Sequence, residues 1–271
     1  MVEREIGAPW EGFLVEPAGG GSAAVLVLGG SSGRVEAERC RLLAARGLTA
    51  LSIRWFGGPG QAAGIREIPL ETFTAAVDLL SAAGPRRIGV LGTSKGAEAA
   101  LLLAVADPRI DAAIALAPTS VVWEGFGAGP DGSTGPGRSS WTWKGEPLPF
   151  VRYDRASWPP PGRPAAFLGM YESSREGYAA AAIDVAASRA ELLLVAGGDD
   201  LMWPSARFAA ELAARRDVRL VTHPRAGHRV RLPGEPPLPR SPIHQYGGTP
   251  EADAALGTAA WPDVLELLAA R

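Results

Sequence analysis

Short, almost purely apolar segments alternate with longer amphipathic segments along most of this chain, and this alternation limits its possible folds more than any other feature. Apolar runs bounded by glycine or proline are typical of strands buried on both faces. Parallel strands need long crossover connections, usually helices. The pattern therefore predicts an α/β fold with a mostly parallel central sheet flanked by helices. The expected strands are residues 23–30, 48–58, 86–92, 109–118, 190–198 and 218–224, and the expected helices are residues 35–47, 69–84, 94–106, 204–216 and 250–271, the last broken near Pro262.

The regular alternation stops between residues 119 and 178, where the chain becomes rich in Gly, Pro, Ser and Trp. A structureless stretch of this length is unusual inside a compact domain. Its aromatic side chains need a surface to pack against, which favours an insertion over one end of the sheet and argues against a linker. We therefore predict one domain over residues 1–271, with 119–178 as a lid or cap; a merely structural cap is the alternative. The aromatic residues concerned are Trp123, Trp141, Trp143, Phe150 and Trp158.

Charge, cysteine content and the terminal sequence exclude several classes of protein. The chain carries a formal net charge of −2, which argues against nucleic acid or an anionic membrane as a partner. The N-terminus lacks the apolar stretch of a secretory signal and no apolar run is long enough to span a bilayer, so we expect a cytoplasmic protein. The only cysteine, Cys40, falls in a predicted helix and is expected to be a buried thiol. No metal-ligand spacing is evident, and we expect no metal and no cofactor.

Residues 92–96 read Gly-Thr-Ser-Lys-Gly, a G-x-S-x-G pentapeptide between a predicted strand and a predicted helix. A turn this tight admits only small residues at positions 92 and 96. It holds the central Ser94 in a strained conformation, with its hydroxyl exposed above the sheet. This setting predicts the nucleophile of an α/β-hydrolase fold. The alternative is an ordinary serine N-cap of the following helix.

A serine nucleophile needs a general base, and the chain has three histidines. His228 follows the last predicted strand in a glycine-containing loop, where the base of an α/β-hydrolase fold is expected. His223 ends the strand itself and fits a structural role. His244 follows a proline-rich loop and fits a surface or pocket-lining role. We therefore predict that His228 is the base.

The base needs a carboxylate that fixes its tautomer, and two adjacent aspartates compete for this role. Asp199 and Asp200 follow the strand at 190–198 and precede a helix. One of them can orient His228 while the other caps the helix or braces the loop. The residue pattern alone does not decide which of the two aspartates orients His228.

Attack on an acyl carbonyl also needs donors for the oxyanion that develops. The backbone N–H of Lys95, the residue after the nucleophile, is one donor by geometry. The second is expected from the loop after the first core strand, where Gly30 and Ser31 are the candidates. The Lys95 side chain is expected to face solvent or a neighbouring carboxylate, and we assign it no chemistry.

Six segments along the chain are informative when taken together: IREIPLETFTAAVDLL (65–80), GVLGTSKGAEAALLLA (89–104), SWTWKGEPLPFV (140–151), GGDDLMWPS (197–205), HPRAGH (223–228) and YGGTPEADAALGTAAWPDVLELL (246–268). Together they resemble the C-terminal catalytic domain of acyl-CoA thioesterases and bile acid-CoA:amino acid N-acyltransferases. The resemblance implies an α/β-hydrolase fold with a Ser or Cys nucleophile, an Asp and a His. It aligns the family's acid with Asp200, which leaves Asp199 as the alternate. Members with serine at the nucleophile position tend to hydrolyse, so Ser94 favours water as the acceptor.

The chain also departs from the better-known animal members. Only residues 1–22 precede the first predicted core strand, so we expect no N-terminal β-sandwich domain here. The segment after His228 is rich in Pro and Arg, which is expected to reshape the mouth of the pocket. We predict a serine hydrolase acting on a small-molecule acyl thioester or ester. The alternatives are an acyltransferase or cyclase that uses an amine or alcohol, and a catalytically silent relative that binds a ligand.

Overall fold

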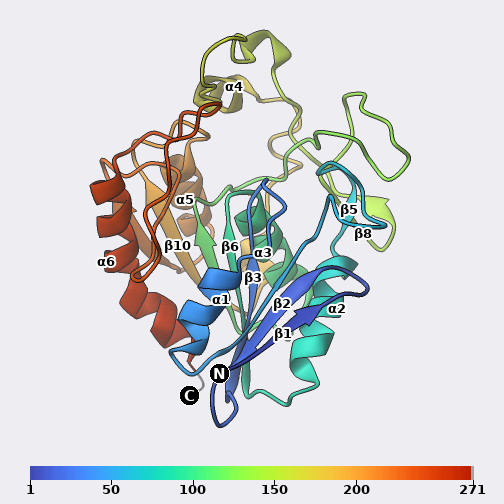
Figure 1. The fold of residues 1–271 in the computed structure, drawn as a ribbon. Coiled ribbons are helices and arrows are strands. Elements are labelled where there is room, and N and C mark those ends of the chain that lie inside the picture. Colours follow the sequence, from blue (N-terminus) through green and yellow to red (C-terminus); the bar gives the residue numbers. More distant parts are fainter. Residues whose placement is uncertain (270–271) are drawn as a thin grey trace.

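Eight strands form one central sheet in the computed structural model, which describes residues 1–269 (Figure 1). The strand order is β1-β2-β4-β3-β6-β7-β10-β11. All pairs from β4 to β11 are parallel, and β1 and β2 are antiparallel to their neighbours. The predicted parallel sheet is therefore confirmed. The strands are β1 (Val2–Ile6), β2 (Gly12–Glu16), β3 (Ala23–Leu28), β4 (Thr49–Ile53), β6 (Arg87–Thr93), β7 (Ala112–Leu116), β10 (Glu191–Gly197) and β11 (Arg219–His223).

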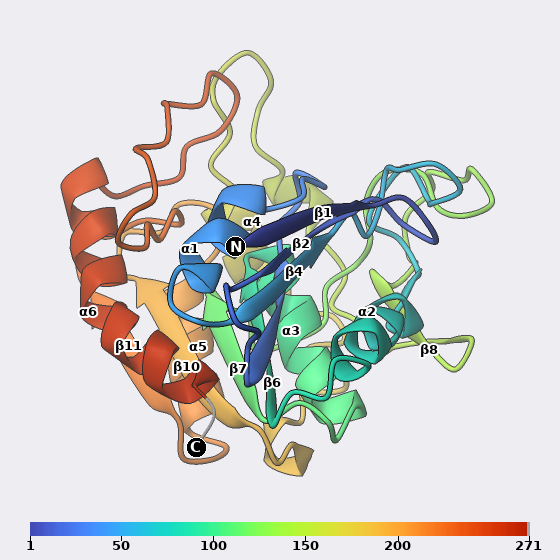
Figure 2. The same cartoon turned by 60° about the horizontal axis from the view of Figure 1, so that its bottom comes forward.

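Helices cover both faces of the sheet, as Figures 1 and 2 show. Alternate residues of β3 point to opposite faces, because side chains alternate along a strand. Val25 and Val27 pack in one core cluster with α1 and α6, and Leu26 and Leu28 pack in the other with α2, α3 and α5. The helices are α1 (Ala37–Ala44), α2 (Glu71–Ser81), α3 (Lys95–Ala106), α4 (Leu168–Ser173), α5 (Ser205–Ala213) and α6 (Pro250–Leu268), with 3₁₀ turns at Arg155–Ser157 and Val185–Ala187.

Cys40 lies in α1 and is fully buried, as predicted. Burial raises the pKa of its thiol to about 12. The thiol therefore stays protonated at neutral pH and acts as a small apolar side chain.

The sequence did not predict the hairpin of β1 and β2, which extends the sheet beyond β4. The β1 strand is exposed along most of its length and carries charged residues at Glu3, Arg4 and Glu5. Charges on an outer strand discourage pairing with another chain. They also hide the apolar alternation on which strand prediction depends.

The predicted break of the last helix at Pro262 is wrong, because α6 continues through this residue. A proline removes one backbone hydrogen bond and costs about 3 kcal/mol in an isolated helix. Here Trp261, Val264 and Leu268 are buried against the sheet. Tertiary packing of this face holds the helix together across the proline.

Residues 119–178, which include α4, lie beyond the carboxyl ends of the parallel strands (Figure 1). A small second sheet joins β8 (Trp141–Trp143) to β5 (Ile68–Pro69) and to β9 (Glu146–Pro147). Trp123 and Trp141 are fully buried, whereas Trp158 is 49% exposed. The segment is thus partly built into the core and partly open to solvent. Within residues 1–269, no helix combines the length and the apolar character that crossing a bilayer requires.

Candidate active site

Ser94 stands at the turn between β6 and α3 and has an unusual backbone conformation. Its φ is 57° and its ψ is −122°, a region that residues with a side chain rarely adopt. Its own N–H donates to the Leu116 carbonyl oxygen at 2.9 Å, which ties the turn to the neighbouring strand β7. The conformation matches the strained turn predicted for this position.

The glycines that flank the turn have no room for a side chain. A Cβ added at Gly92 would lie 2.0 Å from the Gly96 carbonyl oxygen. A Cβ added at Gly96 would lie 2.4 Å from the Gly29 oxygen and 2.5 Å from the Leu28 oxygen. Because these contacts are to backbone, no side-chain rotation relieves them.

We therefore expect Gly96→Ala to lower the free energy of unfolding by at least about 2 kcal/mol, because the added methyl overlaps backbone on the neighbouring strand. Chemical denaturation measures this change. Gly169→Ala is a matched control, since a Cβ there meets nothing within 4 Å. An equal effect of the two substitutions would contradict the close packing described here.

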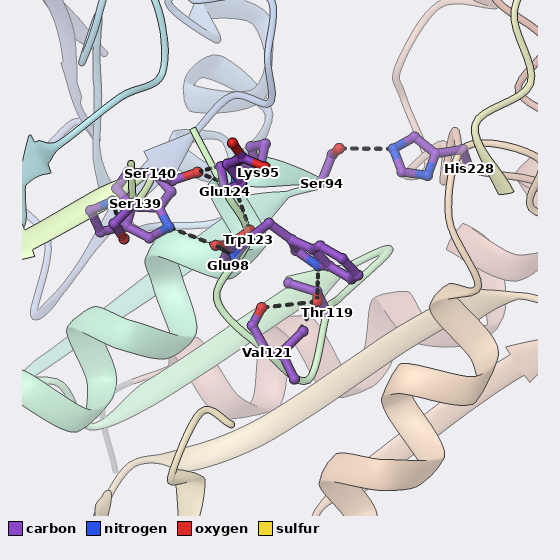
Figure 3. A network of polar contacts seen from close by, with 11 residues as sticks. Ser94, Lys95, Glu98, Thr119, Val121, Trp123, Glu124, Ser139, Ser140 and His228 are labelled. Atoms are coloured by element: carbon purple, nitrogen blue, oxygen red, sulfur yellow. Dashed lines mark hydrogen bonds and ion pairs between the residues drawn. The ribbon is translucent and has the colours of Figure 1, made fainter. Parts of the chain in front are cut away.

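His228 approaches Ser94 from the loop after β11. Its Nε2 lies 2.8 Å from Ser94 Oγ, and the two side chains point toward each other in Figure 3. The His228 backbone N–H donates to the Tyr246 carbonyl oxygen at 2.9 Å. Its ring stacks on Tyr246 and meets the edge of Trp203, with centroids 6.0 Å and 5.6 Å away. The His228 side chain is 7% exposed, and these contacts hold its ring in one orientation.

The two adjacent aspartates, Asp199 and Asp200, have different hydrogen-bond partners in the structure. Asp200 Oδ2 lies 2.8 Å from His228 Nδ1, and Asp200 Oδ1 accepts from the Met202 and Trp203 N–H groups. Asp199 is turned away and accepts from the Gly248 N–H at 2.9 Å. Asp200 is thus placed to orient the histidine, and Asp199 braces the loop.

Of the predicted oxyanion residues, Gly30 lies against Ser94. A Cβ built on Gly30 would lie 3.2 Å from Ser94 Cβ. The loop that carries it is anchored by the Trp55 Nε1–H, which donates to the Gly29 carbonyl oxygen at 3.2 Å. Ser31 follows and is exposed. The Lys95 N–H belongs to the first turn of α3, where a helix leaves its N–H groups without helical acceptors.

The Lys95 side chain points away from Ser94 and into the protein (Figure 3). The residue is 1% exposed, and its Nζ donates to Glu98 Oε2 at 2.7 Å and to Ser140 Oγ at 2.8 Å. The two predicted surroundings of the Lys95 side chain are solvent and a neighbouring carboxylate, and in the structure it contacts the carboxylate of Glu98. Burial lowers the pKa of Lys95, and the Glu98 carboxylate opposes that shift.

Glu98 is fully buried and joins α3 to the segment at 119–178. Its Oε1 accepts from the Trp123 backbone N–H at 3.0 Å and from Trp141 Nε1–H at 2.7 Å. Sequence reasoning missed this residue. The sequence does contain a signal for it. Lys95 and Glu98 carry opposite charges three residues apart in an otherwise apolar helix. A charged side chain in a buried helix needs a partner inside the protein.

The other two histidines, His223 and His244, have surroundings that differ from each other. His223 Nδ1 accepts from the Arg225 N–H at 3.2 Å, which fits the structural role considered for it. The His244 ring packs near Phe167 and Tyr246 and lines a pocket, one of the positions expected for it. Burial, reinforced by Arg229, lowers the pKa of His244.

Residues 68–270 match the model of the BAAT / acyl-CoA thioester hydrolase C-terminal family. The chain belongs to this family. The resemblance read from the sequence segments is thus confirmed. Human acyl-coenzyme A thioesterase 1 is 26% identical in an alignment that covers 92% of this chain and 60% of the relative. The human mitochondrial acyl-coenzyme A thioesterase 2 is also 26% identical, over 92% of this chain and 52% of its own length. The chain therefore spans little more than half the length of these members.

A solved structure agrees with this family fold. A Klebsiella pneumoniae protein assigned as a dienelactone hydrolase aligns with a TM-score of 0.53, covering 98% of this chain and 97% of its own at 15% identity. At this identity the likeness concerns the fold alone. Together with the parallel sheet and its flanking helices, it confirms the predicted α/β-hydrolase fold.

Proposed function

We propose that this chain is a serine hydrolase that cleaves acyl thioesters or esters through Ser94, His228 and Asp200. One observation carries the proposal: His228 Nε2 lies 2.8 Å from Ser94 Oγ while His228 Nδ1 lies 2.8 Å from Asp200 Oδ2. This relay gives an otherwise weak hydroxyl a general base and fixes the tautomer of that base. Membership in a thioester hydrolase family supports the same chemistry.

In the proposed first step, His228 Nε2 takes the Ser94 proton as Oγ attacks the acyl carbonyl carbon. The carbonyl oxygen becomes an oxyanion, stabilised by the N–H of Lys95 and an N–H from Gly30 or Ser31. The carbon–sulfur or carbon–oxygen bond to the leaving group then breaks, and His228 returns its proton to that group. The product of this step is an acyl ester of Ser94.

In the second step, His228 removes a proton from water, which attacks the acyl ester and releases the carboxylic acid. The Ser94 oxygen regains a proton from the imidazole. Asp200 remains ionised throughout and stabilises the imidazolium that forms in each step. Asp200 Oδ1 also accepts hydrogen bonds from the Met202 and Trp203 backbone N–H groups, which hold the carboxylate in position beside the histidine ring.

Residues 119–178 form the proposed cap over the acyl chain. Two features support this role: the segment lies beyond the carboxyl ends of the strands (Figure 1), and part of it lines a pocket of about 320 Å³ with Trp158 and Met170. Ligands of open α/β sheets bind at this edge.

Hydrolysis in ¹⁸O-labelled water tests this proposal against acyl transfer. The substrates are acyl thioesters of coenzyme A and acyl esters of an aryl alcohol, each in a series of acyl-chain lengths. We expect the released acid to carry one ¹⁸O atom from the solvent. Added glycine or an alcohol should not divert the acyl group into an amide or ester. A dominant amide or ester product would favour the transferase, and no turnover of any substrate would favour a silent binding protein.

A further inference from the structure

A buried ion pair begins one residue after Ser94, and the proposed hydrolysis makes no use of its charges. Lys95 Nζ donates to Glu98 Oε2 at 2.7 Å, and both side chains lie inside the protein. The Lys95 ammonium also lies over the Trp141 ring, 5.4 Å from the ring centroid. Replacing a buried ion pair with apolar residues of similar volume is often neutral or stabilising, so such a pair is a poor means of stabilising a fold. What the charges add is direction, because charge-assisted hydrogen bonds are short, strong and geometrically defined.

Glu98 is attached to the Ser94 turn at two points. Its backbone N–H donates to the Ser94 carbonyl oxygen at 3.1 Å, and its carboxylate holds the Lys95 ammonium. Ser94 has the strained backbone conformation with a φ of 57°, and Lys95 carries the N–H proposed to stabilise the oxyanion. A residue stays in such a conformation only where the surrounding contacts fix it. The ion pair is one of these contacts, and it acts on the residue that follows the strained one.

The same ion pair is bonded to the cap at residues 119–178 (Figure 3). Glu98 Oε1 accepts from the Trp123 backbone N–H and from Trp141 Nε1–H, and Lys95 Nζ donates to Ser140 Oγ. Each charged group therefore has one bond to its partner on α3 and at least one to the cap. The start of α3 and the cap are held at a fixed distance from each other by this arrangement.

Ring contacts continue from this point to the proposed base. Trp123 meets the edge of Tyr171, with ring centroids 4.6 Å apart. Tyr171 meets Trp203 at 5.5 Å, and Trp203 meets the His228 ring at 5.6 Å. The backbone that presents the oxyanion donor and the rings behind the base are thus both in contact with residues that Glu98 binds.

We propose that Glu98 is a positioning residue of the hydrolase site, which acts through Lys95 to fix the N–H that stabilises the oxyanion. The inference rests on the proposed hydrolysis and goes beyond its triad, since neither charge touches the substrate or the reacting atoms. A displacement of about 1 Å in an active site can lower the rate on the order of 100-fold. The loss falls on the transition state, where the oxyanion exists, and not on substrate binding.

The double variant Lys95→Met/Glu98→Gln tests this role, because it removes both charges and keeps an acceptor for the Trp123 and Trp141 N–H groups. We expect kcat for an acyl thioester to fall roughly 10- to 100-fold, with KM changed by less than about twofold. Ser188→Ala is the matched control, since the buried Ser188 hydroxyl donates to the Ala104 carbonyl oxygen at the far end of α3. It should leave kcat and KM unchanged.

Two ketones distinguish a positioning role from a general loss of structure. An alkyl trifluoromethyl ketone forms a bond between its carbonyl carbon and Ser94 Oγ, the proton passes to His228 Nε2, and the carbonyl oxygen becomes an oxyanion. The matching methyl ketone binds without forming this adduct. In the double variant, the inhibition constant of the trifluoromethyl ketone should rise by the factor by which kcat/KM falls, and that of the methyl ketone should not change. Equal weakening of both ketones, or the unmodified kcat, would overturn the proposal.

Ser140→Ala is a second variant, which keeps both charges and removes one partner of the Lys95 ammonium. We expect a fall in kcat of roughly threefold and the same rise in the inhibition constant of the trifluoromethyl ketone. If the double variant does not fold, an unchanged kcat and an unchanged inhibition constant in Ser140→Ala would overturn the proposal. Failure of the unmodified protein to hydrolyse any thioester or ester would instead contradict the hydrolase proposal.

Discussion

Ser94→Ala should lower kcat for thioester hydrolysis by a factor on the order of 10⁴ to 10⁶, because removing the nucleophile of a triad removes the function of the other members as well. Any remaining rate would come from substrate binding and the oxyanion donors. Steady-state kinetics on a single coenzyme A thioester measure the loss. The free energy of unfolding should change little, since alanine keeps the backbone of the turn and removes only one hydroxyl.

Ser81→Ala in α2 is a suitable control, because its hydroxyl donates to the Val77 carbonyl oxygen in the same helix. It should retain full activity. Substantial turnover by Ser94→Ala, with the same substrate and free of contaminating enzyme, would mean that the acyl group is cleaved elsewhere on the molecule.

Glu98→Gln should lower the free energy of unfolding by about 3–5 kcal/mol, the usual effect of removing one partner of a buried ion pair. Lys95 and Glu98 have 2% and 0% exposed side chains, so the ammonium left behind has no access to water. It must either stay charged in the interior or lose its proton, and both cost stability. Denaturation in urea measures the change.

The double variant Lys95→Met/Glu98→Gln is the informative comparison. The glutamine oxygen can still accept from Trp123 and Trp141, which Glu98 serves now. Methionine fills the apolar space of the lysine stem without a charge. We expect the double variant to be more stable than Glu98→Gln by at least about 1 kcal/mol. Glu98→Gln within about 1 kcal/mol of the unmodified protein would contradict the burial of this pair.

The parts of this structure that follow from the sequence are those with local physical causes. The strand-to-helix turn at Ser94 could be predicted because only glycines fit at 92 and 96, where added Cβ atoms would lie 2.0 Å and 2.4 Å from backbone oxygens. The parallel sheet could be predicted because strands buried on both faces are apolar throughout.

The parts that the sequence left open depend on contacts between distant segments. Asp199 and Asp200 are chemically identical neighbours, and only the Gly248 N–H and the His228 ring distinguish them. Lys95 could face solvent in many helices, and its burial depends on Ser140, 45 positions away. The continuity of α6 through Pro262 depends likewise on packing against the sheet.

The central claim is that the His228 imidazole makes the Ser94 hydroxyl nucleophilic, and labelling with a fluorophosphonate tests it most directly. Folded protein should be modified once, on Ser94, as located by peptide mass spectrometry. His228→Gln should slow labelling by a factor on the order of 10³ or more, as for loss of a general base, while His244→Gln should label at the unmodified rate. Native protein that is not labelled at Ser94, or His228→Gln that labels as fast as the unmodified chain, would contradict the account.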